Sequence, residues 1–283
     1  MSSSSSLFVS RRPHAPALPA SSIRHLVGRI GYVTRVSVAT SFGLLLLWQI
    51  AASLEVVPAM FLPSPFAVAT KFVAVSRDGF QDATLLEHLL ASVGRVTAAL
   101  VAAVILGVAV GFAMNLNQTA QGVVTPILEL YRPIPPLAYL PLVIIWFGIG
   151  EFAKVLVIFL GILPSIVIAT NEGLRSVSPD RVNAARSLGA TRAQVIFLVL
   201  LPHAMPSILT GTRIGLGAGW ATLVAAELIA ATKGLGFMIK GAADFLVTDV
   251  VILGILVIAA AAIVMEMGLR VVQRVVAPWQ GRE

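Results

Sequence analysis

The chain consists largely of long runs of apolar residues, and these runs restrict the solvent in which it can fold. Six segments meet or approach the roughly 20 mostly apolar residues that a helix needs to cross a bilayer. Only 12% of the residues are charged, about half the share found in soluble domains. We therefore expect an all-α membrane protein with six transmembrane helices. The expected helices cover residues 36–54, 88–114, 123–149, 152–170, 207–231 and 249–270.

The segments outside these runs differ from one another in composition. Residues 1–35 hold five arginines and no acidic residue, and they lack the early apolar core of a signal peptide, so we expect a disordered basic tail. Residues 55–87 are mixed in polarity and contain three prolines, which favours an amphipathic segment at the outer membrane surface. Residues 171–206 form a polar loop, and residues 271–283 form a short tail.

The lysines and arginines are distributed unevenly between the two sides of this expected topology. Cytoplasmic loops of membrane proteins carry an excess of these residues. The two tails and the 171–206 loop hold twelve of the twenty, and the opposite side holds five. We therefore expect both termini and the 171–206 loop to be cytoplasmic. The twelve are Arg11, Arg12, Arg24, Arg29, Arg35, Arg175, Arg181, Arg186, Arg192, Arg270, Arg274 and Arg282, and the five are Lys71, Arg77, Lys154, Lys233 and Lys240.

Several kinds of site are not indicated. The net charge of +7 does not indicate nucleic acid as a partner, because most of the basic residues are isolated arginines that flank apolar segments. The chain has no cysteine and no phosphate-binding loop of the G-x-x-x-x-G-K-[ST] type, and its four histidines are far apart in sequence. We therefore expect neither a bound metal nor an ATPase site, and no set of nucleophile, histidine and acid indicates an enzyme.

One polar stretch interrupts the apolar runs between the fourth and fifth expected spans. Ser178, Pro179 and Asp180 are typical of a helix start, because they suit the cap, the first position and the positive dipole end of a helix. The apolar residues that follow recur at every third position and predict an apolar stripe on one face of a short helix. These residues are Val182, Ala185 and Leu188.

A glycine and a proline divide the rest of this stretch. Gly189 predicts the end of the first helix, and Thr191 with Gln194 predicts a capping box that begins a second helix. This second helix is expected to end before Pro202. From the residues alone, a pair of helices lying on the lipid surface fits as well as a docking site for a partner protein.

The residues of this stretch resemble a known motif. NAARSLGA followed by VLLP is similar to the EAA loop of ATP-binding-cassette importer permeases, in which Glu-Ala-Ala precedes a glycine and, further along, a Leu-Pro pair. Asn183 stands where the family usually has glutamate. The resemblance implies an importer-permease fold whose cytoplasmic loop couples the chain to an ATPase. The residues implied to do this are Asn183, Ala184, Ala185, Gly189, Val199, Leu201 and Pro202.

The resemblance extends from about residue 40 to the end of the chain. LPSPFAV, RPIPPLAYLPLVIIWFGIG and TGTRIGLGAGWATLVAAELIAATKGLGFMI are similar to the nitrate, sulfonate and taurine branch of these permeases, and the last stretch to its taurine permeases. The family implies a permease homodimer in the plasma (inner) membrane, a pair of ATPase subunits that hold ATP and Mg²⁺, and an external substrate-binding protein. It also implies import of taurine or a related sulfonate, with alkanesulfonate or nitrate as alternatives, and no cofactor in this chain.

Two groups of residues are candidates for the pore, a gate or dimer packing. Prolines at the start of the third span, Pro135 and Pro136 among them, predict a broken helix that needs cover from protein or water; a kinked helix packed against its neighbours is the alternative. In the fifth span, Gly211, Gly215 and Gly219 form a small-residue face. This face fits a pore or dimer contact as well as packing within the chain.

The fifth span holds two further candidates, Trp220 and Glu227. Trp220 fits a pore-facing position and a packed position equally. Ionisable residues within a span are costly and indicate function, so Glu227 is a candidate gate residue. The alternative is a structural carboxylate at a helix end, bonded to a neighbouring backbone group, and the nearby Lys233 is compatible with that.

Two other classes of protein compete with an ATP-driven permease. A secondary transporter driven by an ion gradient is expected to show paired carboxylates or an inverted repeat near the middle of the membrane. The sequence shows neither pattern. A membrane enzyme would need a converging acid–base or metal set, and none is present.

Overall fold

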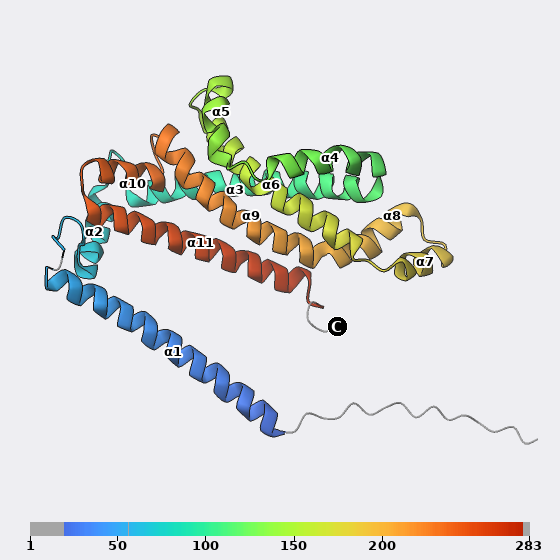
Figure 1. Cartoon of the computed structure of the whole chain (residues 1–283), viewed down its shortest axis with the longest axis horizontal. Helices are drawn as coiled ribbons and strands as arrows, with labels where there is room; N and C mark the ends of the chain where they lie inside the picture. The colour runs from blue at the N-terminus through green and yellow to red at the C-terminus, as the bar shows by residue number, and fades with distance from the viewer. Residues whose placement is uncertain (1–19, 56, 280–283) are drawn as a thin grey trace, which may run out of the picture. The chain divides into compact units, whose positions relative to one another are not determined.

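The computed structural model describes residues 20–55 and 57–279, and it is helical almost throughout (Figure 1). The chain divides into two compact units, Met1–Val56 and Val57–Glu283, which are described separately. In the first unit, α1 covers Ala20–Ser53, and its part Thr34–Ser53 is long and apolar enough to span a membrane. The disordered tail predicted for residues 1–35 is therefore helical from Ala20 onward, and residues 1–19 lie outside the described part.

The second unit is built on four long apolar helices. These are α3 (Leu85–Leu116), α6 (Glu151–Arg175), α9 (Leu201–Ala230) and α11 (Thr248–Val276). With α1, the described residues contain five helices that can cross a membrane, and a bent pair of shorter helices raises the number to six. The prediction of an all-helical membrane protein is confirmed.

The third predicted span, residues 123–149, is not one helix. It is α4 (Gln118–Tyr131), the 3₁₀ turn η1 (Pro136–Tyr139) and α5 (Leu140–Phe147), and the two halves meet at an angle of 92°. Proline has no backbone N–H and fixes its own φ angle, so the consecutive Pro135 and Pro136 cannot continue α4. The break that the prolines predicted is present.

The core of the second unit surrounds α6, which packs along α3 on one side and α9 on the other. Figure 1 shows α6 between these two helices. Buried apolar side chains from all three helices, including Ala103, Ile162 and Leu223, form one cluster. Close approach of α3 to α6 depends on Gly107, because a side chain there would collide with Ile166.

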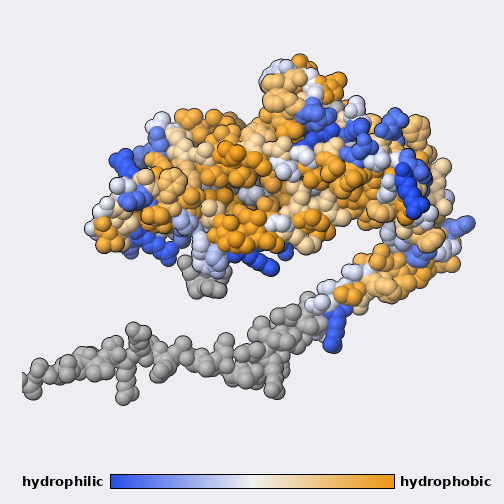
Figure 2. Space-filling model, turned by 180° about the vertical axis from the view of Figure 1, so that it is seen from behind, coloured by the Kyte–Doolittle hydropathy of each residue, from blue (hydrophilic) through white to orange (hydrophobic). Residues whose placement is uncertain are grey.

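The outer surface of the second unit is strongly apolar. Val101 and Ile105 of α3 are 53% and 69% exposed, and Ile263 and Val264 of α11 are 52% and 67% exposed. Figure 2 shows apolar surface over much of the visible face, with hydrophilic side chains gathered in a few places. A soluble protein rarely exposes so large a contiguous apolar surface, whereas lipid accommodates it.

Two short helices, α2 (Pro65–Asp78) and α10 (Leu235–Asp244), lie between the long ones. No helix was predicted at the position of α10. Within the predicted segment 55–87, α2 is capped by Ser64 and packs against the start of α11. Val68 and Val75 of α2 are buried, so α2 is a packed element. Between α9 and α11 lies α10, whose buried Leu235 and Met238 hold it against both.

The predicted loop 171–206 contains α7 (Pro179–Ser187), α8 (Arg192–Gln194) and the π-helical segment η2 (Val195–Leu200). The structure differs from the prediction at its end, because the second helix does not stop before Pro202. It runs through η2 directly into α9 and makes one apolar helix over Arg192–Ile229. Pro202 cannot donate to the carbonyl of Leu198, and the wider π turn is where the helix accommodates this loss.

Candidate functional site

The residues predicted from the sequence lie in three sites and in the packing of α9, and the first site is the segment that joins α6 to α9. We call Pro179–Leu200 the coupling segment. Its first helix ends in a Schellman motif, in which Gly189 N–H donates to Arg186 O at 2.9 Å and Ala190 N–H to Ala185 O at 3.1 Å. Gly189 has a φ of +84°, a left-handed conformation that glycine adopts without steric cost. The predicted helix end at Gly189 is present.

The start of the second helix in the coupling segment also follows the sequence pattern. Thr191 and Gln194 form the expected capping box, with Gln194 N–H donating to Thr191 Oγ1 at 3.3 Å and Thr191 N–H to Gln194 Oε1 at 2.8 Å. The start of α7 differs in one respect. Ser178 occupies the cap position, but its side chain makes no capping hydrogen bond.

One face of the coupling segment is packed and the other is exposed. Val195 and Leu200 are buried in a cluster with Leu174 and Ala204, and Val182, Ala185 and Val199 pack against it. Leu188 was predicted to continue this apolar stripe, but it is 89% exposed, because it lies where α7 ends and the chain turns. Asn183, Ala184 and Gly189 are also exposed, whereas Leu201 and Pro202 are half-buried at the start of α9.

A histidine joins the two ends of the coupling segment. His203 Nε2 lies 3.1 Å from Ser176 Oγ, and His203 Nδ1 lies 3.1 Å from Arg181 Nη1. Since Ser176 Oγ already donates to Gly173 O at 2.8 Å, Nε2 is the donor to Ser176, and Nδ1 accepts from Arg181. The end of α6, the start of α7 and the start of α9 are thereby held together.

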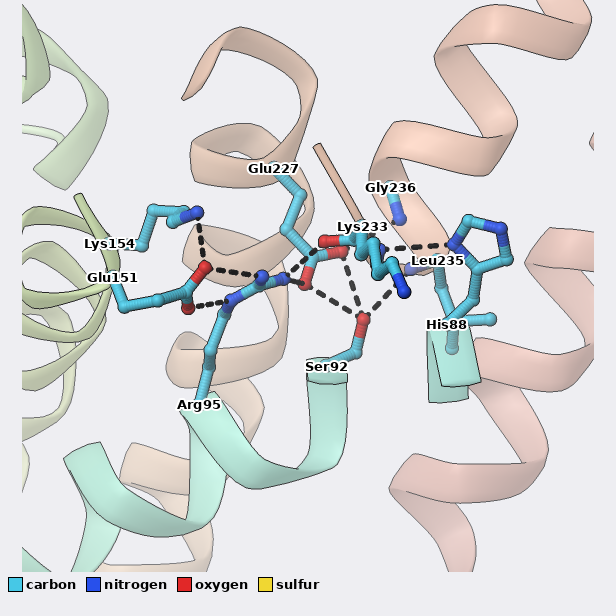
Figure 3. A network of polar contacts seen from close by, with 10 residues as sticks. His88, Ser92, Arg95, Glu151, Lys154, Glu227, Lys233, Leu235 and Gly236 are labelled. Carbon is cyan, nitrogen blue, oxygen red and sulfur yellow. Dashed lines mark hydrogen bonds and ion pairs between the residues drawn. The ribbon is translucent and has the colours of Figure 1, made fainter. Parts of the chain in front are cut away.

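The second site is a buried polar network around Glu227, at the opposite end of α6 (Figure 3). The Glu227 side chain is fully buried. Its oxygens accept hydrogen bonds from Ser92 Oγ at 2.8 and 2.9 Å, Arg95 Nη1 at 2.6 Å and the Gly236 N–H at 2.8 Å. A buried carboxylate with this many donors, one of them a cation, keeps its charge compensated.

The network also fixes the turn between α9 and α10. Gly234 N–H donates to His88 Nδ1 at 3.1 Å, Leu235 N–H donates to Ser92 Oγ at 2.8 Å, and Lys233 O accepts from Arg95 Nη1 at 2.7 Å. The ammonium group of Lys233, which the sequence placed near Glu227, lies 3.4 Å from Glu87. The neighbouring backbone group expected in the structural alternative is the Gly236 N–H.

The third site is the broken span, where hydroxyl groups replace missing backbone hydrogen bonds. Pro164 in α6 has no N–H, so the carbonyl of Leu160, four residues earlier, has no helical donor. Tyr131 Oη donates to this carbonyl at 2.9 Å and is itself hydrogen-bonded to the Tyr139 hydroxyl. The break between α4 and η1 is therefore attached to α6 next to Pro164.

A cavity of about 400 Å³ lies beside this attachment. Pro136 lines it, together with residues of α4, α6 and α9, including Tyr131, Gly161, Ser165 and Ala218. Pro135 is exposed and precedes η1. The freed backbone of the break thus borders both protein and a cavity, which are the two forms of cover that such a break requires within a bilayer.

The glycine face of α9 is in contact with α6 of the same chain. A side chain at Gly211 would overlap Ala169, and one at Gly215 or Gly219 would meet Ile162 at less than 3.0 Å. Trp220 is 6% exposed and belongs to the core cluster of α3, α6 and α9. The structure thus places these four residues in packing within the chain, which is one of the two alternatives that the sequence left open.

The sequence match covers most of this architecture. Residues 103–281 match the family described as "Binding-protein-dependent transport system inner membrane component". The chain belongs to this family. The matched range includes the coupling segment, the broken span from its α4 half onward, and Glu227.

Individual relatives within the binding-protein-dependent transport family support the family membership of this chain. The "Taurine transport system permease protein TauC" of Escherichia coli (strain K12) is 53% identical over 247 residues, which cover 87% of this chain and 90% of that protein. The "Putative aliphatic sulfonates transport permease protein SsuC" of the same strain is 35% identical over 245 residues, covering 84% and 89%. An inward-facing structure of the MetNI methionine ABC transporter, 22% identical, covers 65% of this chain and 95% of that chain with a TM-score of 0.54, and it shows the likeness of fold alone.

The sequence contained a signal for the network that was not used. His88, Ser92 and Arg95 are separated by four and three residues, so they lie on one face of an otherwise apolar helix. Glu151, which accepts from Arg95, and Lys154, which donates to Glu151, lie at the start of α6. Among the residues that the structure describes, no three histidine, aspartate or glutamate side chains are grouped as ligands of a metal ion; that this chain binds no metal or cofactor stays a prediction.

Proposed function

We propose that this chain is the membrane-spanning subunit of an ATP-driven importer for taurine or a closely related sulfonate. The observation that carries the proposal is the 53% identity to the taurine permease TauC, which extends over 87% of this chain and 90% of the relative. Identity at this level over nearly the whole length includes the spans that would line a translocation pathway. The 35% identity to an aliphatic sulfonate permease supports the wider substrate class.

The exposed face of the coupling segment is the surface proposed to dock on a partner ATPase. Ala184 leaves little side-chain bulk, so a backbone can approach closely, and Leu188 offers an apolar contact that is 89% exposed. Asn183 lies beside them as a neutral polar group. The partner is proposed to hold ATP and Mg²⁺, and this chain to perform no hydrolysis itself.

The coupling segment is attached to α6 at one end and to α9 at the other. It can therefore act as a lever that moves both spans. Displacement of α7 reaches α6 through Ser176 and α9 through His203, by the hydrogen bonds described above. The buried face of the coupling segment, which includes Val195 and Leu200, limits how far the segment can deform relative to the spans. ATP-driven closure of two partner ATPases is thus proposed to tilt α6 and α9 together and to alternate the pathway between its outward-facing and inward-facing states.

The assembly is proposed to be a permease homodimer with two ATPase subunits and an external substrate-binding protein. Both termini and the coupling segment are proposed to lie in the cytoplasm, as the distribution of lysine and arginine favours. The network around Glu227 then lies at the outer end of the spans, where the binding protein releases its substrate.

Reconstitution tests the proposal directly. The chain, its partner ATPase and its binding protein are incorporated into liposomes, and uptake of taurine, a longer alkanesulfonate and nitrate is measured with and without ATP. We expect uptake of taurine that requires both ATP and the ATPase, exceeds uptake of nitrate, and stimulates ATP hydrolysis. Uptake that follows an imposed ion gradient in the absence of the ATPase would instead establish a secondary transporter.

A further inference from the structure

The guanidinium of Arg95 lies between two carboxylates that differ sharply in exposure (Figure 3). On one side, Nη1 donates to Glu227 Oε1 at 2.6 Å and to Lys233 O at 2.7 Å. On the other side, Nε donates to Glu151 Oε2 at 2.6 Å and Nη2 to Glu151 Oε1 at 2.9 Å. The Glu227 side chain is 0% exposed and that of Glu151 is 63% exposed. One side of Arg95 is therefore held by buried groups, and the other is closed by a group at the surface.

The buried charges of this cluster do not balance without that surface group. The Lys154 ammonium, on a side chain only 4% exposed, donates to Glu151 Oε1 at 2.6 Å. Two buried cations, Arg95 and Lys154, thus face one buried carboxylate, Glu227. An uncompensated buried charge is strongly unfavourable. The position that the Glu151 carboxylate occupies must therefore hold an anion whenever the two cations stay buried.

The donors around this position suit a small oxyanion of single charge. Arg95 presents two parallel N–H groups, the fork that binds two oxygens of one planar or tetrahedral acid group. Lys154 adds a third donor. The position also lies at the first turn of α6, whose cap residue Gly150 offers no side chain, and the N-terminal end of a helix favours negative charge. A sulfonate has one charge and three oxygens for these donors.

We propose that this position is a binding site for the sulfonate group of the transported substrate, and that Glu151 is an internal anion that occupies it until substrate arrives. The choice of sulfonate as the ligand rests on the proposed function. Glu151 can leave because its carboxylate is mostly exposed and regains water when it swings outward. Arg95 keeps its position after the exchange, because Glu227 and the Lys233 carbonyl still hold Nη1.

The place of the site in the fold agrees with a role at entry. Glu151 is the first residue of α6, a helix of 25 residues whose last residue, Arg175, lies shortly before the coupling segment. At a rise of 1.5 Å per residue the two ends are about 37 Å apart, roughly the thickness of a bilayer. A sulfonate released by a binding protein at the face remote from the ATPase meets this end of α6 first.

A chemical rescue experiment tests the site without transport. The full chain carrying Glu151→Ala is purified in detergent, and its melting temperature is measured with added ethanesulfonate, with equimolar chloride and with neutral ethanesulfonamide. We expect the variant to melt below the wild type, because Arg95 and Lys154 lose their anion. Ethanesulfonate is expected to recover at least half of this loss, and the neutral sulfonamide and chloride clearly less. The wild type, which carries its own anion, is expected to respond little.

Two further variants separate a specific site from a general salt effect. Glu87→Ala removes another exposed glutamate, whose cation Lys233 is itself 50% exposed, so sulfonate should not rescue it. Glu151→Ala combined with Lys154→Met removes one buried cation, restores the charge balance, and should abolish the response to sulfonate. Equal stabilisation of all variants, or no stabilisation of Glu151→Ala by ethanesulfonate, would overturn the proposal. Rescue without taurine uptake in liposomes would refute the proposed function alone, and uptake without rescue would refute this site alone.

Discussion

At the scale of single residues, the clearest case is Glu227. The sequence located it as an ionisable group within a span, but its main partners are 132 and 135 residues away in the chain, at Arg95 and Ser92. Single-sequence patterns report neighbours along one helix, so the glutamate and the polar face of α3 were each visible while their contact was not. The buried network is a product of tertiary packing.

Replacing Glu227 with alanine should destabilise the protein severely. The change leaves Arg95 without its buried partner and the Gly236 N–H without its acceptor, and loss of one partner from a buried pair costs about 3–5 kcal/mol. Ser92→Ala is the milder comparison, because it removes hydrogen bonds and no charge. Thermal unfolding in detergent checks this order. Equal melting temperatures for Glu227→Ala and the wild type would show that the network does not stabilise the fold.

At the scale of elements, the sequence predicted helix ends better than helix continuity. The Schellman glycine Gly189 and the capping box of Thr191 and Gln194 depend on local backbone geometry, and both are present. The prolines of the 123–149 span predicted its break, whereas the stop predicted before Pro202 was wrong. Consecutive prolines interrupt the first of these helices, whose halves meet at 92°, whereas the second helix continues through Pro202 and Pro206, with a π turn immediately before Pro202. Local rules give no measure of how much a neighbouring helix will support a proline.

Gly189 provides a test of the coupling segment as an element. Gly189→Val forces a β-branched residue into a left-handed conformation, which costs about 1–2 kcal/mol and should misplace Leu188 and Asn183. We expect the variant to insert into the membrane normally and to lose ATP-dependent uptake. Gly189→Asn is the matched control, since asparagine tolerates this conformation, and it should retain most of the uptake. Normal uptake by the valine variant would contradict the role of the coupling segment as a lever.

At the scale of the whole molecule, the apolar composition and the low share of charged residues predicted a helical membrane protein with six spans. The described residues contain five helices that can span a membrane, or six if the bent pair counts as one span. The lengths and apolar character of the spans follow from the bilayer itself, so they can be predicted from one chain. Helix α10 could not be predicted in this way, because its ten residues are too few to resemble a span. Its position depends on Gly234 and Gly236, which lie against the Glu227 side chain.

The natural absence of cysteine allows the orientation to be measured with single cysteines. Ser187→Cys places a thiol at the end of α7 in the coupling segment, and Asp244→Cys places one at the end of α10. We expect a membrane-impermeant maleimide to label the second variant in intact cells and the first only after the membrane is opened. The cysteine-free parent chain is the control for background. The reverse labelling pattern would invert the proposed topology.

The glycine contacts between α6 and α9 have a consequence for how force crosses the bilayer. With Gly211, Gly215 and Gly219 packed against Ala169 and Ile162, the backbones of the two helices approach each other closely along this stretch. His203 ties them at one end, and Arg95 bridges Glu151 and Glu227 at the other. Because α6 and α9 are in contact in three places, neither helix can shift or tilt without the other. In the proposed transport cycle, displacement of the coupling segment is therefore expected to move α6 and α9 together while Glu151 stays bound to Arg95.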